Sequence, residues 1–151
     1  MLRISKLADY AMLLMVYLAK HPEQACNAKH ISEKTGVSTA TTSKLLKKLA
    51  QHQLLLTHRG MHGGYELALP PHKIPIGKII QALEGQIALT ACSHSSYQCG
   101  VEKYCIMRDA LRDINAFIQA TLFHISVADL IQPQPLKSLL KKPLLLVEDS
   151  S

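Results

Sequence analysis

The chain has 151 residues, the usual length of one domain, and 48% of them are hydrophobic, which excludes wholesale disorder. Aromatic residues make up only 5% and tryptophan is absent, so aliphatic side chains must build the core. No apolar run reaches the roughly 18 residues that a membrane-spanning helix needs. The net charge is +6, and residues 1–72 hold nine lysines and arginines against four acidic residues. A polyanionic partner is therefore expected in the first half.

The N-terminus has the outline of a secretion signal, because Arg3 and Lys6 precede an apolar stretch at residues 11–19. Helical periodicity argues against this interpretation and predicts a core helix from about Ser5 to Lys20. Its buried face is formed by Leu7, Ala11, Leu14 and Leu18. Three of the four cysteines cluster within fourteen residues, which favours metal or redox chemistry over a disulfide framework. We therefore expect a cytoplasmic protein without a membrane partner.

Two further helices are predicted in the first half. One runs from about Ala28 to Thr35 with Asn27 as its N-cap, and Gly36 then suits a tight turn that needs a positive φ. Ser38 can cap the next helix, which extends to about His52. Its inward stripe consists of Leu45, Leu46 and Leu49. The spacing predicts two helices joined by a glycine turn.

A β-hairpin is predicted next. A buried strand at residues 54–57 and an alternating strand at residues 65–69 flank a glycine-rich turn at residues 59–64. A short helix at residues 76–83 ends at Gly85, and residues 90–105 read as a loop. A long helix follows from about Met107 to Phe123, with an apolar seam of Leu111, Ile114, Ile118, Leu122 and Ile125. Nothing else in so short a chain could bury that seam fully. The simplest partner is the same helix of a second copy of the chain.

This order of elements, with a basic hairpin at its end, is typical of a winged helix-turn-helix that reads DNA. Short polar side chains of the recognition helix would face base edges, namely Thr39, Thr41, Thr42 and Ser43, with Ser38 at the cap. Lys44, Lys47 and Lys48 could meet phosphates. At the wing, Arg59 could enter a narrow minor groove beside His58, His62 and the close-approaching glycines Gly60, Gly63 and Gly64. Each feature alone is equally compatible with a solvated helix face or an ordinary turn.

The cysteine spacing is Cys92-x6-Cys99-x5-Cys105. Soft thiolates on one loop can hold an iron–sulfur cluster, zinc or copper(I). The tight pairs of a structural zinc site are absent, which argues against a zinc knuckle but does not establish iron. Three inert thiols or an adventitious disulfide are the plain alternative. Cys26 is interpreted as a small buried apolar residue.

Several segments resemble one family of regulators over about residues 1–131. They are MLRISKLADYA at residues 1–11, ISEKTGVS at 31–38, HRGMHGGY at 58–65, LEGQIALT at 83–90 and ISVADL at 125–130. The chain resembles the iron–sulfur-sensing transcription regulators typified by IscR and NsrR, and within them most closely the regulators of the SUF cluster-assembly system of gammaproteobacteria. The resemblance implies a homodimer with crossed long helices, a palindromic operator on double-stranded DNA, and a cluster that alters DNA affinity.

The resemblance also implies ligands. Cys92, Cys99 and Cys105 fall on the family's three cysteine ligands, and Arg59 falls on its wing arginine. IscR-like members have a histidine ligand where this chain has Arg108, a very poor ligand. Asp9 matches the aspartate that NsrR-like members supply from the other subunit. A helix-dipole role for Asp9 is equally open, and the other candidate ligands are His94, Glu102 and His124.

Two further expectations rest on the resemblance. IscR has a glutamate at the position matching Ser43, so the operator sequence does not carry over to this chain. A 2Fe-2S cluster is favoured over a 4Fe-4S cluster.

The sequence thus predicts a mainly α protein with a small β-hairpin wing and a long dimerisation helix. Residues 1–72 would form the DNA-binding region, residues 73–131 the short helix, cysteine loop and dimerisation helix, and residues 132–151 a C-terminal tail for which disorder is one interpretation. The predicted function is a transcription regulator, a repressor of iron–sulfur cluster assembly genes. Alternatives are a nitric-oxide or redox sensor of the same fold, and a small iron–sulfur carrier. No motif indicates an enzyme.

Overall fold

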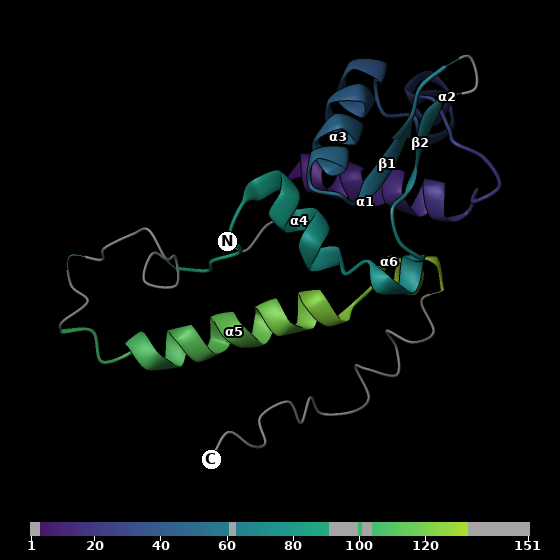
Figure 1. Cartoon of the computed structure of the whole chain (residues 1–151). Coiled ribbons are helices and arrows are strands. Elements are labelled where there is room, and N and C mark those ends of the chain that lie inside the picture. Colours follow the sequence, from purple (N-terminus) through teal and green to yellow (C-terminus); the bar gives the residue numbers. More distant parts are fainter. Residues whose placement is uncertain (1–3, 61–62, 91–99, 101–103, 133–151) are drawn as a thin grey trace.

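A computed structural model describes residues 4–60, 63–90, 100 and 104–132 of the chain (Figure 1). Its helices are α1 (Lys6–Ala19), α2 (Ala28–Thr35), α3 (Thr39–Gln51), α4 (Ile76–Glu84), α5 (Arg108–His124) and α6 (Val127–Ile131), with a short 3₁₀ turn at Pro71–Lys73. Two strands, β1 (Leu55–His58) and β2 (Gly64–Leu67), form an antiparallel hairpin. The predicted class, mainly α with a hairpin wing, is confirmed.

The first three helices begin and end where local chemistry dictates. The Ser5, Asn27 and Ser38 side chains accept hydrogen bonds from the amides of Ala8, His30 and Thr41, and so cap α1, α2 and α3. Gly36 ends α2 in the left-handed conformation, with φ of 74°, which glycine adopts without strain. The predicted caps and the turn between α2 and α3 are therefore confirmed.

The hydrophobic core draws on nearly every element. Leu14 of α1, Ile31 of α2 and Leu46 of α3 are fully buried, as are Ile79 of α4 and Val127 of α6. The core therefore continues past residue 72, and α4 and α6 pack on the helix-turn-helix. Aliphatic side chains supply it, as the composition requires.

One predicted core position of α1 is wrong. Leu7 is 42% exposed, and the neighbouring Ala8 is fully buried in its place. In the first turn of α1, the small residue Ala8 therefore faces the core. Helix α4 lies close by, since the Ser5 amide donates to the Glu84 carboxylate at 3.0 Å.

The hairpin is joined to the helix-turn-helix through its second strand. Leu55 pairs with Leu67 at the base and His58 with Gly64 near the tip. The backbone of Cys26, just before α2, forms a bridge with Tyr65, with N–O distances of 3.0 and 2.9 Å. A Cβ on Gly64 would lie 2.5 Å from the Cys26 carbonyl carbon, so this close approach requires glycine.

The long helix α5 lies apart from the helix-turn-helix, with α4 and α6 nearest to it in Figure 1. Only Asn115 of α5 is buried. The predicted seam is only partly covered: Ile114 is 50% exposed, its four other members are half-buried, and nearby Phe117 is 41% exposed. At the α4–α5 contact, a Cβ on Gly77 would lie 2.7 Å from the Phe123 ring.

The predicted tail, apart from Gln132, lies outside the described residues, and so does most of the predicted cysteine loop. Within the part of the chain that the structure describes, no helix is long and apolar enough to span a membrane.

Candidate nucleic-acid interface

The first turn of α3 carries the predicted base-reading hydroxyls. Ser38 and Thr39 are exposed and Thr41 is half-buried. The Ser38 hydroxyl donates to the Thr41 hydroxyl oxygen at 2.9 Å, and the Thr39 hydroxyl lies 3.0 Å from the hydroxyl of Ser32 on α2. These contacts hold the start of the helix in one geometry, which is what a surface that reads base edges needs.

The prediction that Thr42 faces base edges is wrong. Its side chain is fully buried and its hydroxyl donates to the Val37 carbonyl at 3.2 Å, so it packs under the turn between α2 and α3 instead of facing solvent. Thr42 lies three residues before Leu45 and seven before Leu49, which places it on the inward stripe of the helix. Ser43, one residue further, is half-buried.

The lysines of α3 divide into two groups. Lys44 and Lys47 are exposed and make no ion pair within the described residues, so their charge faces solvent uncompensated. Lys48 is half-buried, and its ammonium donates to the carbonyl of Leu83 in α4 at 2.9 Å. The expectation that Lys48 meets phosphate is therefore wrong, since its ammonium is directed toward α4. No sequence signal linked residue 48 to residue 83.

The wing presents Arg59 beside its tip. Arg59 is exposed and follows His58, whose Nε2 lies 2.9 Å from the Glu66 carboxylate across the hairpin. Gly60 has a φ of 110°, and a Cβ on Gly63 would lie 2.4 Å from the His58 carbonyl oxygen. Gly63 therefore serves the turn itself, besides any contact with DNA. The other predicted wing residue, His62, lies outside the described residues.

The predicted metal ligands are only partly described. Asp9 is exposed in the first turn of α1, and Cys105 is half-buried with a free thiol. Cys92 and Cys99 lie outside the described residues, as do His94 and Glu102; His124 is exposed at the end of α5. The described residues bring together no group of three side chains able to hold a metal. Cys26 is buried, as predicted, and burial raises the pKa of its thiol.

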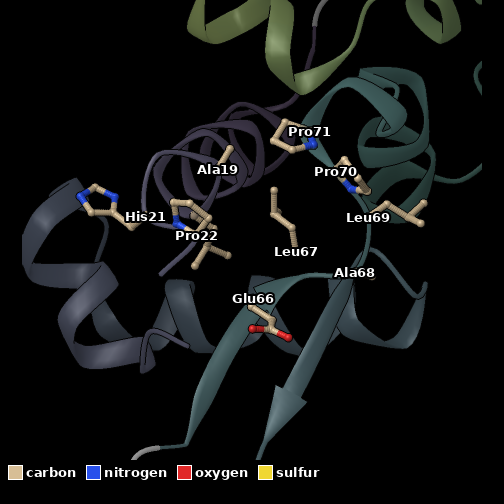
Figure 2. Close-up of a pocket in the computed structure, with 10 residues that line it drawn as sticks. Ala19, His21, Pro22, Glu66, Leu67, Ala68, Leu69, Pro70 and Pro71 are labelled. Atoms are coloured by element: carbon tan, nitrogen blue, oxygen red, sulfur yellow. The ribbon is translucent and has the colours of Figure 1, made fainter. Parts of the chain in front are cut away.

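A cavity of about 360 Å³ lies between the end of α1 and the exit of β2 (Figure 2). Ala19 and Pro22 line it from one side, and Leu67, Pro70 and Pro71 line it from the other. None of the predicted DNA-contacting residues lines this cavity. It is a mostly apolar hollow behind the wing.

A recognition helix with a polar, basic exposed face and a glycine-tipped wing therefore occur together. The sequence profile of the Rrf2 family, described as iron-dependent transcriptional regulators, matches residues 4–133. The chain belongs to the Rrf2 family. This Rrf2 protein is a DNA-binding transcription regulator and not an enzyme.

Individual relatives agree with the family. The chain is 29% identical to the regulator IscR of Aliivibrio salmonicida, over 86% of this chain and 77% of that protein. It is 26% identical to the regulator NsrR of Oceanobacillus iheyensis, over 87% and 90% of the two chains. Among solved structures, CymR, the global cysteine regulator of B. subtilis, is similar with a TM-score of 0.70, 28% identity, and coverage of 89% of this chain and 99% of that one.

Proposed function

We propose that this Rrf2 regulator senses an iron–sulfur cluster and represses iron–sulfur cluster assembly genes, those of a SUF-type system first. The carrying observation is the trio Cys92, Cys99 and Cys105 in a chain whose family is described as iron-dependent. Thiolates are soft ligands that bind iron–sulfur clusters well, whereas magnesium and calcium prefer hard oxygen ligands. A regulator that binds DNA acts where DNA is, so we place it in the cytoplasm.

The proposed fourth ligand is Asp9, supplied to the partner subunit. Two observations support this role: its side chain is exposed, and it makes no ion pair or side-chain hydrogen bond within the described residues. A carboxylate is a weak, hard ligand for iron, so it could be displaced easily. When bound, the cluster supplies a centre that responds to iron and redox state; 2Fe-2S is the expected type.

On the DNA side, we propose that Ser38, Thr39, Thr41 and Ser43 face the bases, while Lys44 and Lys47 meet phosphates. Arg59, with His62 and the backbone at Gly63, would enter the minor groove. The exposed apolar face of α5 would pair two subunits, so that two recognition helices reach successive major grooves, about 34–36 Å apart. Selection from a random-sequence duplex pool should recover a palindrome; recovery of sequences without dyad symmetry would contradict the dimeric reading.

The cluster is tested by anaerobic purification followed by iron, sulfide and zinc analysis and an absorption spectrum. Thiolate-to-iron charge transfer should give absorbance between roughly 320 and 460 nm with matching iron and sulfide. The Asp9→Ala variant should lose or destabilise the cluster while remaining folded. Glu23→Ala, which removes an exposed carboxylate from the loop after α1, is the matched control and should keep the wild-type spectrum.

A second candidate is a regulator that responds to cysteine or thiol oxidation without a cluster. The likeness to CymR, the global cysteine regulator of B. subtilis, favours it. A colourless protein that binds zinc or no metal after reconstitution, but still binds duplex DNA, would select this candidate. An Asp9→Ala variant with an intact cluster would remove only the proposed fourth ligand.

A further inference from the structure

The last turn of α4 contacts both the recognition helix and the first helix. The ammonium of Lys48 in α3 donates to the Leu83 carbonyl at 2.9 Å. One residue on, the Glu84 carboxylate accepts a hydrogen bond from the backbone amide of Ser5, the N-cap of α1, at 3.0 Å. Both α1 and α3 pack against α4. A single helical turn therefore contacts both α3 and the start of α1.

The chain that leaves this turn is held by α5. Gly85 ends α4, and the amide of Leu89 then donates to the Asn115 side chain at 3.0 Å. The Gln119 side chain donates to the Ile87 carbonyl. Asn115 is the one buried residue of α5, so this contact is the most protected part of that helix. A short segment, residues 85–90, thus joins α5 to the last turn of α4.

The Lys48 contact also has an electrostatic reason. A helix C-terminus carries partial negative charge, which a nearby cation stabilises. The last turn of α4 has no basic residue of its own, so Lys48 supplies that cation from the neighbouring helix. Its ammonium is half-buried there, whereas Lys47, the adjacent residue, points its charge to solvent.

We infer that Lys48 is a positioning residue for DNA binding, and that through Leu83 it couples the position of α5 to the recognition helix. The inference rests on the DNA-binding function of this family and not on the proposed cluster. It makes the last turn of α4 the junction through which a change at α5 reaches α3.

The first test compares Lys48→Met with Lys47→Met on a duplex selected by the wild-type protein from a random pool. Loss of one phosphate contact lowers the slope of log affinity against log salt by about 0.9. Lys47→Met should show this change. Lys48→Met should weaken binding about fivefold or more, the size of a typical coupling between linked sites, with the wild-type salt slope. A slope reduced as in Lys47→Met, or unchanged affinity, would overturn the inference.

A double-mutant cycle tests the coupling. Asn115→Ala removes the acceptor for Leu89, and its effect on DNA affinity should largely disappear in the Lys48→Met background. The matched cycle of Asn115→Ala with Lys47→Met should be additive, as for independent sites. Additivity in both cycles would refute the coupling. Affinities refer to the folded fraction, and Lys48→Arg, which keeps donor and charge, should restore wild-type binding.

The two proposals fail in different ways. A wild-type protein that selects no duplex would count against the DNA-binding assignment on which the inference depends. A protein that selects a duplex but holds no cluster leaves both comparisons fully informative, because neither uses the metal.

Discussion

On α3, adjacent side chains of the same chemical type have different roles. Thr42 is buried beneath the turn while Ser43 borders the surface, and Lys48 binds α4 while Lys47 faces solvent. Each step along an α-helix rotates the side chain by about 100°, so adjacent residues lie on different faces. Residue type alone therefore overstates how many hydroxyls and lysines this helix can offer to DNA.

The buried position of Thr42 yields a prediction. Thr42→Val removes its hydrogen bond to the Val37 carbonyl, but that oxygen still accepts from the Ser32 hydroxyl at 2.7 Å. We expect a loss of about 1 kcal/mol in the free energy of unfolding, measured in urea, with unchanged affinity for the selected duplex. Ser43→Val should instead weaken binding. The reverse ranking of the two variants in DNA affinity would show that Thr42 reaches the groove.

The close approach at Gly64 yields another. A Cβ there would lie 2.5–2.9 Å from backbone atoms of Cys26 and Asn27, which cannot move as a side chain can. Gly64→Ala should cost about 1–3 kcal/mol of stability and weaken DNA binding by displacing the wing. Thermal unfolding of the variant and of the wild-type protein measures the difference, and equal melting temperatures would contradict the steric argument.

Among the elements, α6 shows how short a helix can be when its N-terminus is capped. Ser126 and Asp129 form a reciprocal capping box, in which the Asp129 carboxylate accepts from the Ser126 amide at 2.8 Å and from its hydroxyl at 2.6 Å. The pKa of Asp129 is lowered, and the hydrogen bond from the Ser126 side chain is the largest cause. Val127 then buries this five-residue helix in the core.

The lowered pKa of Asp129 predicts a pH dependence. A carboxylate whose folded pKa lies below its ordinary value of 3.8 stabilises the fold fully above that value, and this stabilisation is lost as the pH falls through the folded pKa. Asp129→Asn should therefore lower the free energy of unfolding by about 1 kcal/mol at pH 7 and by less at acid pH. Urea unfolding between about pH 7 and pH 3 measures the difference. A constant difference across that range would contradict it, and Asp113→Asn serves as the exposed control.

Local signals in the sequence account for most elements and few of the contacts between them. Caps, glycine turns and hydrophobic spacing predicted α1 to α5 and the hairpin, with ends within a residue or two of the structure for the helices. The five residues of α6 are too few for a periodic pattern, although Ser126 and Asp129 carried a capping signal. Lys48 to Leu83 and Leu89 to Asn115 depend on packing between elements far apart in sequence, which no local pattern encodes.

For the whole molecule, one side of α5 is an exposed apolar surface. Ile106 and Met107, just before the helix, are 100% and 60% exposed, and Ile114 and Phe117 continue the apolar face along it. Asn115 and Gln119 lie on another side and hold the chain's own residues 87–89. The proposed dimer would bury the apolar side and leave the self-contact intact.

A charge placed on either side of α5 tests this arrangement. Ile114→Glu would bury a carboxylate in the proposed interface, so we expect a monomer in sedimentation equilibrium and weaker binding to a palindromic duplex. Ala116→Glu introduces the same charge two residues away, at an exposed position on the opposite side, and should leave the wild-type mass. Identical masses for both variants would place the pairing surface elsewhere.

The bridge between Cys26 and Tyr65 has a consequence for local opening. Each residue's amide donates to the other's carbonyl, so the wing cannot separate from the start of α2 without breaking both hydrogen bonds. Hydrogen exchange of these two amides should therefore follow one opening event and show the same protection. The wing would then move with the body of the helix-turn-helix as a single cooperative unit, so that its orientation on DNA is set when the helices fold.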